Sequence, residues 1–243
     1  MALRESRIAA LDPGRRVSTE GATFATPFAT PARIRLAAVT RHLVDTVLTT
    51  EGASDEELDA AADAAERIVT DLLGRAVDTG ARPTGTRSRH EARQEDYLPR
   101  SPLVGPANPV APPLAYEFHD DHVVAHGQFG AAYEGPPGYV HGGWVALAFD
   151  EALGMANAIS GTPGMTARLT VRYRKPTPLR TRLHLHARTE RVDGRRITTV
   201  ATLRAGDSVT AEAEGLFVVI GAERALEYFG ERPSTPEPTD PLP

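Results

Sequence analysis

The stretch that decides the fold is Glu134–Gly154, which reads EGPPGYVHGGWVALAFDEALG. It begins with glycine and proline, passes through one histidine and two more glycines, and ends in an apolar run typical of a buried helix. One aspartate, Asp150, lies in the middle of that run. Burying a carboxylate is costly unless it is paired. Asp150 therefore either has a chemical role or lies at a solvent-facing edge of the helix, beside Glu151.

The segments on either side of this stretch predict antiparallel β-strands. Residues 114–130 predict a hairpin that turns near Asp120 and Asp121. After the helix, four more segments have strand character, at about 165–175, 180–191, 195–205 and 208–220. In the first of them, apolar residues alternate with arginine and threonine, which is the period of a strand with one buried face.

Turn signals and the apolar helix together predict an α+β fold. Asp193-Gly194 and Gly206-Asp207 favour tight hairpins between the later strands. A helix over about 142–158 that is apolar on most of its surface must bury that surface. An antiparallel sheet wrapped around this one central helix would bury it.

Two further helices are predicted upstream, from apolar residues at helical spacing over 36–48 and 58–73. Ser54 and Glu57 provide a capping box for the second helix, and Gly74 is a suitable stop. A pair of helices could form a DNA-reading module. The second helix is strongly acidic, however, so a packing appendage is the better interpretation and no nucleic-acid partner is expected.

These patterns divide the chain into five predicted parts. They are a disordered arm (1–32), a helical hairpin appendage (33–77), a linker with an extended Pro-rich segment (78–113), the α+β domain (114–229, ending in a short helix at 222–229) and a disordered tail (230–243).

Composition excludes several classes of protein. The 243 residues carry a formal net charge of −5 and contain no cysteine, so disulfides and thiolate chemistry are absent. We expect no membrane span, because no apolar run is long enough. The amino terminus lacks the apolar core of a secretory signal, and we expect a cytoplasmic protein.

The junction of loop and helix at Gly142 and Gly143 suggests a site for a developing negative charge. Glycine allows a ligand to approach the backbone, and the first N–H groups of a helix have no internal partner. Such donors stabilise the oxyanion that forms when an ester or thioester is attacked. Asp150 lies about two turns, or roughly 10 Å, further along. A bound ligand or a second chain would be needed to bridge that distance.

A carboxylate in an apolar helix tends to keep its proton and can serve as a base near neutral pH, or attack directly. On the residues alone, a structural role for Asp150 or for His141 remains open.

Two segments in combination indicate a protein family more specifically than any single residue does. GPPGYVHGGWVALAFDEALG followed by GMTARLTVRYRKPTPL resembles the hotdog-fold acyl-CoA thioesterases, in particular the PaaI-like group and the mitochondrial thioesterase-superfamily-member type. The resemblance covers residues 101–221. It depends on the order His-Gly-Gly, an Asp seven residues after the second Gly, Thr-Ala-x-Leu, and a Tyr followed by two basic residues and Pro.

The resemblance implies roles for the reacting groups. Asp150 would be the general base or nucleophile, and the Gly143 N–H, beside Gly142, would polarise the thioester carbonyl. His141 would help position the thioester. Thr166 would orient the attacking water, usually from the partner subunit.

The resemblance also implies a binding mode and an assembly. Arg172 and Arg174 would lie near the coenzyme A phosphates, although a solvated strand face is an equal alternative for them. The active form would be a homodimer or homotetramer with sites between subunits. No metal or cofactor is implied.

The expected function is therefore hydrolysis of an acyl-CoA thioester to free acid and CoA. A non-catalytic hotdog protein that binds acyl-CoA as a sensor is the main alternative. A hotdog hydratase ranks last, because its Asp and His pair at the start of the central helix is missing. The acyl group is open, with a weak preference for medium or long aliphatic chains.

Overall fold

The computed structural model describes residues 29–75, 100–161 and 164–220. It divides into two compact units. The first contains residues up to Leu48 together with 94–220, and the second contains 49–93 together with 221–243. Each unit is considered separately below.

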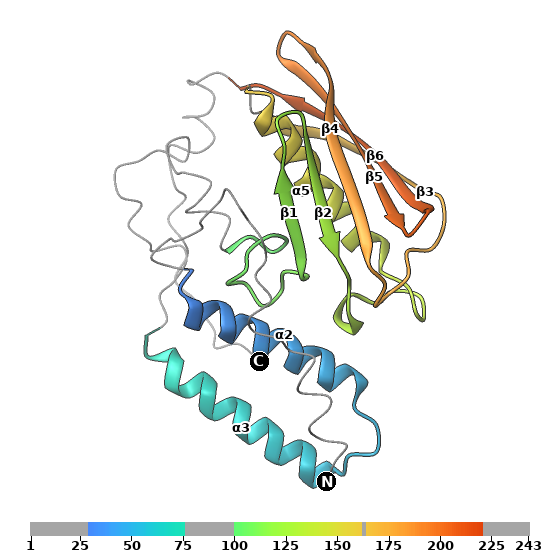
Figure 1. Ribbon diagram of the computed structural model, residues 1–243. Helices are drawn as coiled ribbons and strands as arrows, with labels where there is room; N and C mark the ends of the chain where they lie inside the picture. Colours follow the sequence, from blue (N-terminus) through green and yellow to red (C-terminus); the bar gives the residue numbers. More distant parts are fainter. Residues whose placement is uncertain (1–28, 76–99, 162–163, 221–243) are drawn as a thin grey trace. The chain divides into compact units, whose positions relative to one another are not determined.

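The first unit is built on a six-stranded sheet in which every neighbouring pair is antiparallel (Figure 1). The strands are β1 (Leu114–Phe118), β2 (His122–Gly127), β3 (Met165–Tyr173), β4 (Leu183–Asp193), β5 (Arg196–Ala205) and β6 (Ser208–Val218). Their order across the sheet is β1-β2-β4-β5-β6-β3. The predicted hairpin and the four later strands are thereby confirmed, and β3, first after the central helix, becomes an edge strand.

The tight turns form where the sequence predicts them. Gly194 connects β4 to β5 and Gly206 connects β5 to β6, and both adopt a φ of 56°. This is the left-handed region, which glycine enters without a steric penalty. The two hairpins fix the register of β4, β5 and β6.

The helix α5 (Gly142–Ile159) lies against one face of this sheet, as Figure 1 shows. It contacts β2, β3, β4, β5 and β6. Its buried side chains form the centre of the core, and Phe149, Ala152, Leu153 and Ala156 are each 0% exposed. The expected α+β hotdog arrangement, an antiparallel sheet around one central helix, is confirmed.

The helix α2 (Pro31–Thr49) contributes side chains to the first unit. The Arg41 guanidinium donates to the carbonyls of Ala111 (2.6 Å) and Asn108 (3.0 Å). Asp45 accepts a 2.5 Å hydrogen bond from the Ala131 N–H. A side chain at Gly130 would lie 2.5 Å from the Asp45 carboxylate, so this approach requires glycine. α2 therefore holds the loops that precede β1 and α5.

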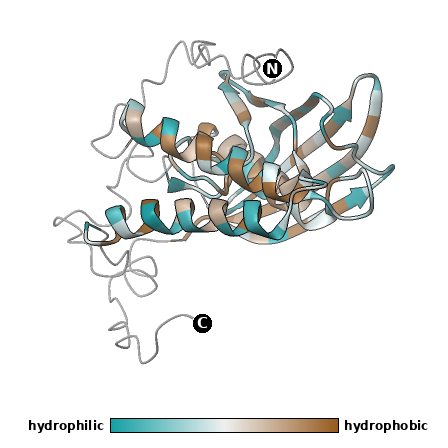
Figure 2. Cartoon of the chain, turned by 90° about the horizontal axis from the view of Figure 1, so that it is seen from below, coloured by the Kyte–Doolittle hydropathy of each residue, from teal (hydrophilic) through white to brown (hydrophobic). Residues whose placement is uncertain are grey.

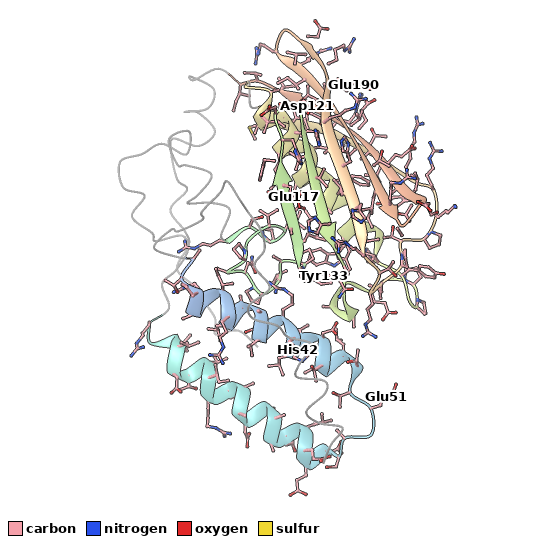
Figure 3. All side chains as sticks on the ribbon, in the orientation of Figure 1. His42, Glu51, Glu117, Asp121, Tyr133 and Glu190 are labelled. Carbon is pink, nitrogen blue, oxygen red and sulfur yellow. The ribbon has the colours of Figure 1, made fainter. Side chains whose placement is uncertain are left out.

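The helix α3 (Asp55–Leu73) belongs to the second unit. Ser54 caps it and forms the predicted capping box with Glu57, and the helix ends at Gly74. Hydrophobic and hydrophilic positions alternate around both α2 and α3 in Figure 2. The predicted appendage is thus divided between the two units, and its packing as one hairpin stays a prediction.

Three of the predicted parts fall wholly or largely outside the described residues: the arm at 1–28, the linker at 78–99, and the closing helix and tail from 221 onward. Among the helices that the structure describes, none has the length and apolarity to span a bilayer.

Candidate active site

The loop before α5 is held in a fixed shape by backbone contacts. Glu134 and Val140 form a β-bridge, and the Glu134 carboxylate accepts a 2.6 Å hydrogen bond from the Gly138 N–H. A Cβ at Gly135 would lie 2.7 Å from the Cα of His141, so only glycine allows the two sides of the loop to meet. The glycine- and proline-rich start of the motif therefore positions His141 at the helix entrance.

His141 is the N-cap of α5. Its Nδ1 accepts a 3.0 Å hydrogen bond from the Gly143 N–H. The backbone N–H of His141 donates to the backbone carbonyl of Tyr133. The Tyr133 ring packs edge-on against Trp144 at a centroid distance of 4.9 Å. The sequence predicts a free donor at Gly143. In this structure the donor is turned toward the histidine ring.

The peptide between Gly142 and Gly143 is also held at its carbonyl end. The Tyr173 hydroxyl, from the end of β3, donates a 2.8 Å hydrogen bond to the Gly142 carbonyl. A Cβ at Gly142 would lie 3.4 Å from the Tyr173 ring, and a Cβ at Gly143 would lie 3.1 Å from His141 Nδ1. Both glycines therefore lie directly against the side chains that fix this peptide.

Asp150 and Thr166 form the second part of the site. Asp150 is half-buried on α5, and Thr166 is exposed near the start of β3. The Thr166 hydroxyl donates a 3.1 Å hydrogen bond to Asp150 Oδ1. The resemblance implies a threonine from the partner subunit, whereas here both residues belong to the same chain.

A β-bulge brings Thr166 to this position. Thr166 pairs with Phe217 and Arg168 with Leu216, so Ala167 is an extra residue in β3. Strict alternation would put Thr166 on the same face as Arg168. The bulge turns it instead toward the face of buried Phe217, where α5 lies. Bulges often redirect a side chain in this way beside functional sites.

Glu151, the residue after Asp150, has the most unusual carboxyl environment on the helix. Burial, and after it the nearby negative charge of Asp150, together raise the pKa of Glu151 from 4.5 to about 7. Tyr116 on β1 faces the same region. Burial, and then the charge of Glu151, raise the pKa of the Tyr116 hydroxyl, which has no hydrogen-bond partner among the described residues. A proton-holding carboxyl thus lies beside Asp150.

Arg172 and Arg174 lie away from Asp150 and Thr166. After the bulge, Leu169 and Val171 pack against the core, so Arg172 points to the opposite face of the sheet from α5. Arg174 forms a 2.6 Å ion pair with Glu212 on β6. Within one chain the structure does not bring these arginines together with Asp150, and their role toward CoA stays a prediction.

The predicted residues thus form two groups, one at the start of α5 and one at its middle. His141, Gly142 and Gly143 form a polarised helix start, and Asp150 with Thr166 forms a carboxylate–hydroxyl pair about two turns away. In the described ranges, no group of three or more His, Asp or Glu side chains is arranged to hold a metal ion.

Sequence reasoning missed two contributors to this site. Tyr173 was recognised only as part of a motif, and Glu151 only as a neighbour. A tyrosine three residues before the proline of that motif, and a second carboxylate in an apolar helix, are the signals that point to them.

An antiparallel sheet around a central helix, with a carboxylate and a polarised helix start on that helix, defines a hotdog-type domain. The sequence of residues 137–212 matches the family described as Thioesterase superfamily. A crystal structure of a thioesterase superfamily protein is 37% identical, covers 76% of this chain and 90% of its own, and superposes with a TM-score of 0.67. The chain belongs to the thioesterase superfamily.

Curated relatives agree with this family. The acyl-coenzyme A thioesterase THEM4 of Mus musculus is 33% identical over 115 residues, which is 46% of this chain and 50% of the relative. The THEM4 protein of Xenopus laevis is 36% identical over 108 residues, 43% of this chain and 48% of the relative. This chain therefore spans about half the length of the curated relatives that it matches.

Proposed function

We propose that this chain is an acyl-CoA thioesterase that uses Asp150 to deliver water to the thioester carbonyl. The observation that carries the proposal is the 3.1 Å hydrogen bond from Thr166 to Asp150 on the half-exposed face of α5. A carboxylate and a hydroxyl in contact at a surface can bind one water between them and orient it. The relatives named as acyl-coenzyme A thioesterases support CoA thioesters as the substrate class.

The chemistry requires one proton acceptor and one oxyanion donor. Thr166 occupies Oδ1 of Asp150, which leaves Oδ2 to take a proton from water as the water oxygen attacks the carbonyl carbon. The carbonyl oxygen becomes negative and accepts a hydrogen bond from the Gly143 N–H. In this role it replaces His141 Nδ1 as the acceptor of that N–H or shares the N–H with it. When the carbon–sulfur bond breaks, the proton on Asp150 passes to the CoA sulfur. The products are the free acid and CoA.

Distance favours a site shared by two chains. Gly143 and Asp150 are about two helical turns, or roughly 10 Å, apart on the same helix. One carbonyl group cannot contact the N–H of Gly143 and a water on Asp150 of the same chain. We therefore expect Gly143 of one chain to face Asp150 of a second copy in a homodimer or homotetramer.

The edge strand β3 supports the same assembly. All of its nine residues except the bulged Ala167 pair with β6 on one side, and among the described strands nothing pairs with the other side. Met165 is 44% exposed and Tyr173 is 55% exposed. Long exposed edges are normally covered, because their free backbone groups recruit another strand. The opposite edge, β1, has only five residues. We therefore expect β3 to meet β3 of a second copy. Light scattering after size-exclusion chromatography tests whether the chain is oligomeric, and a monomer would contradict this expectation.

The direct test is release of free thiol from a panel of acyl-CoAs that differ in chain length and aromaticity. Wild type should turn over at least one of them, and Asp150→Asn should lose about a hundredfold or more in kcat, as expected for loss of a general base. Asn keeps the size of Asp and can still bond to Thr166. Asp193→Asn, in the exposed β4–β5 turn, is the matched control and should keep full activity.

Two results would contradict the proposal. Full activity in Asp150→Asn would leave an enzyme but remove the role given to this carboxylate. Saturable acyl-CoA binding without any thiol release would favour the non-catalytic sensor.

A further inference from the structure

We propose that Tyr173 is a positioning residue for the oxyanion donor: its hydroxyl fixes the Gly142–Gly143 peptide so that the Gly143 N–H keeps its direction. This inference rests on the proposed function, in which that N–H binds the thioester oxygen. Tyr173 itself touches no reacting atom. It acts through the peptide to which it is bonded.

The geometry follows from the planarity of one peptide unit. The Gly142 carbonyl and the Gly143 N–H belong to the same rigid plane, so a bond at one end limits the direction of the other. Tyr173 donates to the carbonyl at 2.8 Å, and His141 Nδ1 accepts from the N–H at 3.0 Å. The plane is thus held at both ends by side chains from two different elements.

Glycine makes such a restraint necessary. Two successive glycines have more backbone freedom than any other pair, and this freedom favours a tilted or flipped peptide. A Cβ at Gly142 would lie 3.4 Å from the Tyr173 ring, in ordinary van der Waals contact, so the tyrosine lies directly against this flexible backbone. The hydrogen bond from Tyr173 on the neighbouring strand restrains the peptide that the two glycines leave free to rotate.

The same bond also strengthens the donor. A hydrogen bond accepted by a peptide carbonyl polarises the unit and makes its N–H a better donor, by about 10–30% per bond. Because the oxyanion carries more charge than the ground-state carbonyl, the gain is larger in the transition state. Loss of the hydroxyl should therefore lower kcat more than it raises KM.

The placement of Tyr173 argues against a packing role alone. Its side chain is 55% exposed in the chain, yet its hydroxyl is directed to one backbone carbonyl. The register of β3 explains the direction, because Leu169, Val171 and Tyr173 share the face toward α5 after the bulge at Ala167. Phenylalanine at 173 would keep the contact with Gly142 and remove only the hydroxyl.

The test is Tyr173→Phe with two readouts. In ¹H–¹⁵N spectra we expect the Gly143 amide proton to move upfield and to exchange faster with solvent. In thiol-release kinetics we expect kcat to fall about three- to tenfold, the value of one ordinary hydrogen bond, with KM nearly unchanged. Tyr139→Phe is the matched control, since the Tyr139 hydroxyl makes no hydrogen bond to the described residues and the side chain is 40% exposed.

The two readouts separate the possible failures. An unchanged Gly143 resonance in Tyr173→Phe overturns the inference whatever the activity. A changed resonance with unchanged kcat overturns the catalytic part. If wild type hydrolyses no acyl-CoA at all, the proposed function fails, while the amide resonance still decides whether Tyr173 holds the peptide.

Discussion

Replacing Glu151 with glutamine should change how the stability of the domain depends on pH. Burial against the region of Tyr116, together with the charge of Asp150, raises the pKa of Glu151 from 4.5 to about 7. The folded state therefore binds more protons than the unfolded chain between those two values. The contribution of Glu151 to stability is fully present below about pH 4.5 and is lost as pH rises through 7.

The magnitude follows from the same shift. One pKa unit corresponds to about 1.4 kcal/mol, so the full difference is about 3 kcal/mol, and partial exposure of the carboxyl reduces it to roughly 1–3 kcal/mol. Glutamine has no charge to desolvate. Glu151→Gln should therefore be about 1–3 kcal/mol more stable than wild type at pH 8 and nearly equal to it at pH 4.5.

Urea unfolding at several pH values, at one fixed protein concentration, measures this difference. Glu190→Gln, an exposed carboxylate on β4, is the control and should show no such trend. The reasoning is refuted if the stability difference between Glu151→Gln and wild type is the same at pH 4.5 and pH 8. It is also refuted if the variant is the less stable protein at pH 8.

Three further changes test the account of the fold. Phe149→Ala removes a ring that is 0% exposed and should cost about 3–5 kcal/mol in urea unfolding; a cost below 1 kcal/mol would contradict the core described for α5. Asp45→Ala removes the acceptor of the Ala131 N–H and should cost about 1–3 kcal/mol, whereas an unchanged midpoint would mean that α2 does not hold that loop. Ser54→Ala should cost α3 about 1 kcal/mol, seen as faster amide exchange in its first turn.

The strands and the capping box could be predicted because each depends on local residue types. Glycine-containing dipeptides at 193–194 and 206–207 fix the hairpins whatever surrounds them, and Ser54 with Glu57 defines a helix start by itself. The apolar period of α5 likewise identifies it as the helix that the sheet must cover.

The details of the site could not be predicted in the same way, because they depend on contacts between distant segments. Alternation along β3 would send Thr166 away from α5, and only pairing with β6 reveals the bulge at Ala167. The role of Tyr173 and the burial of Glu151 depend on how β3 and β1 pack around α5. The resemblance implied CoA phosphate contacts for Arg172 and Arg174, whereas within one chain Arg174 forms an ion pair with Glu212, and the role of both arginines toward CoA stays a prediction.

The measurement that tests the central claim most directly is a double-mutant cycle on Asp150 and Thr166, read as kcat on the best acyl-CoA. Thr166→Val alone should cost about tenfold or more, the value of a hydrogen bond to a charged group. If the pair acts as one unit on one water, the same change should cost almost nothing in the Asp150→Asn background. Equal costs in both backgrounds would contradict the account, because the two residues would then act independently.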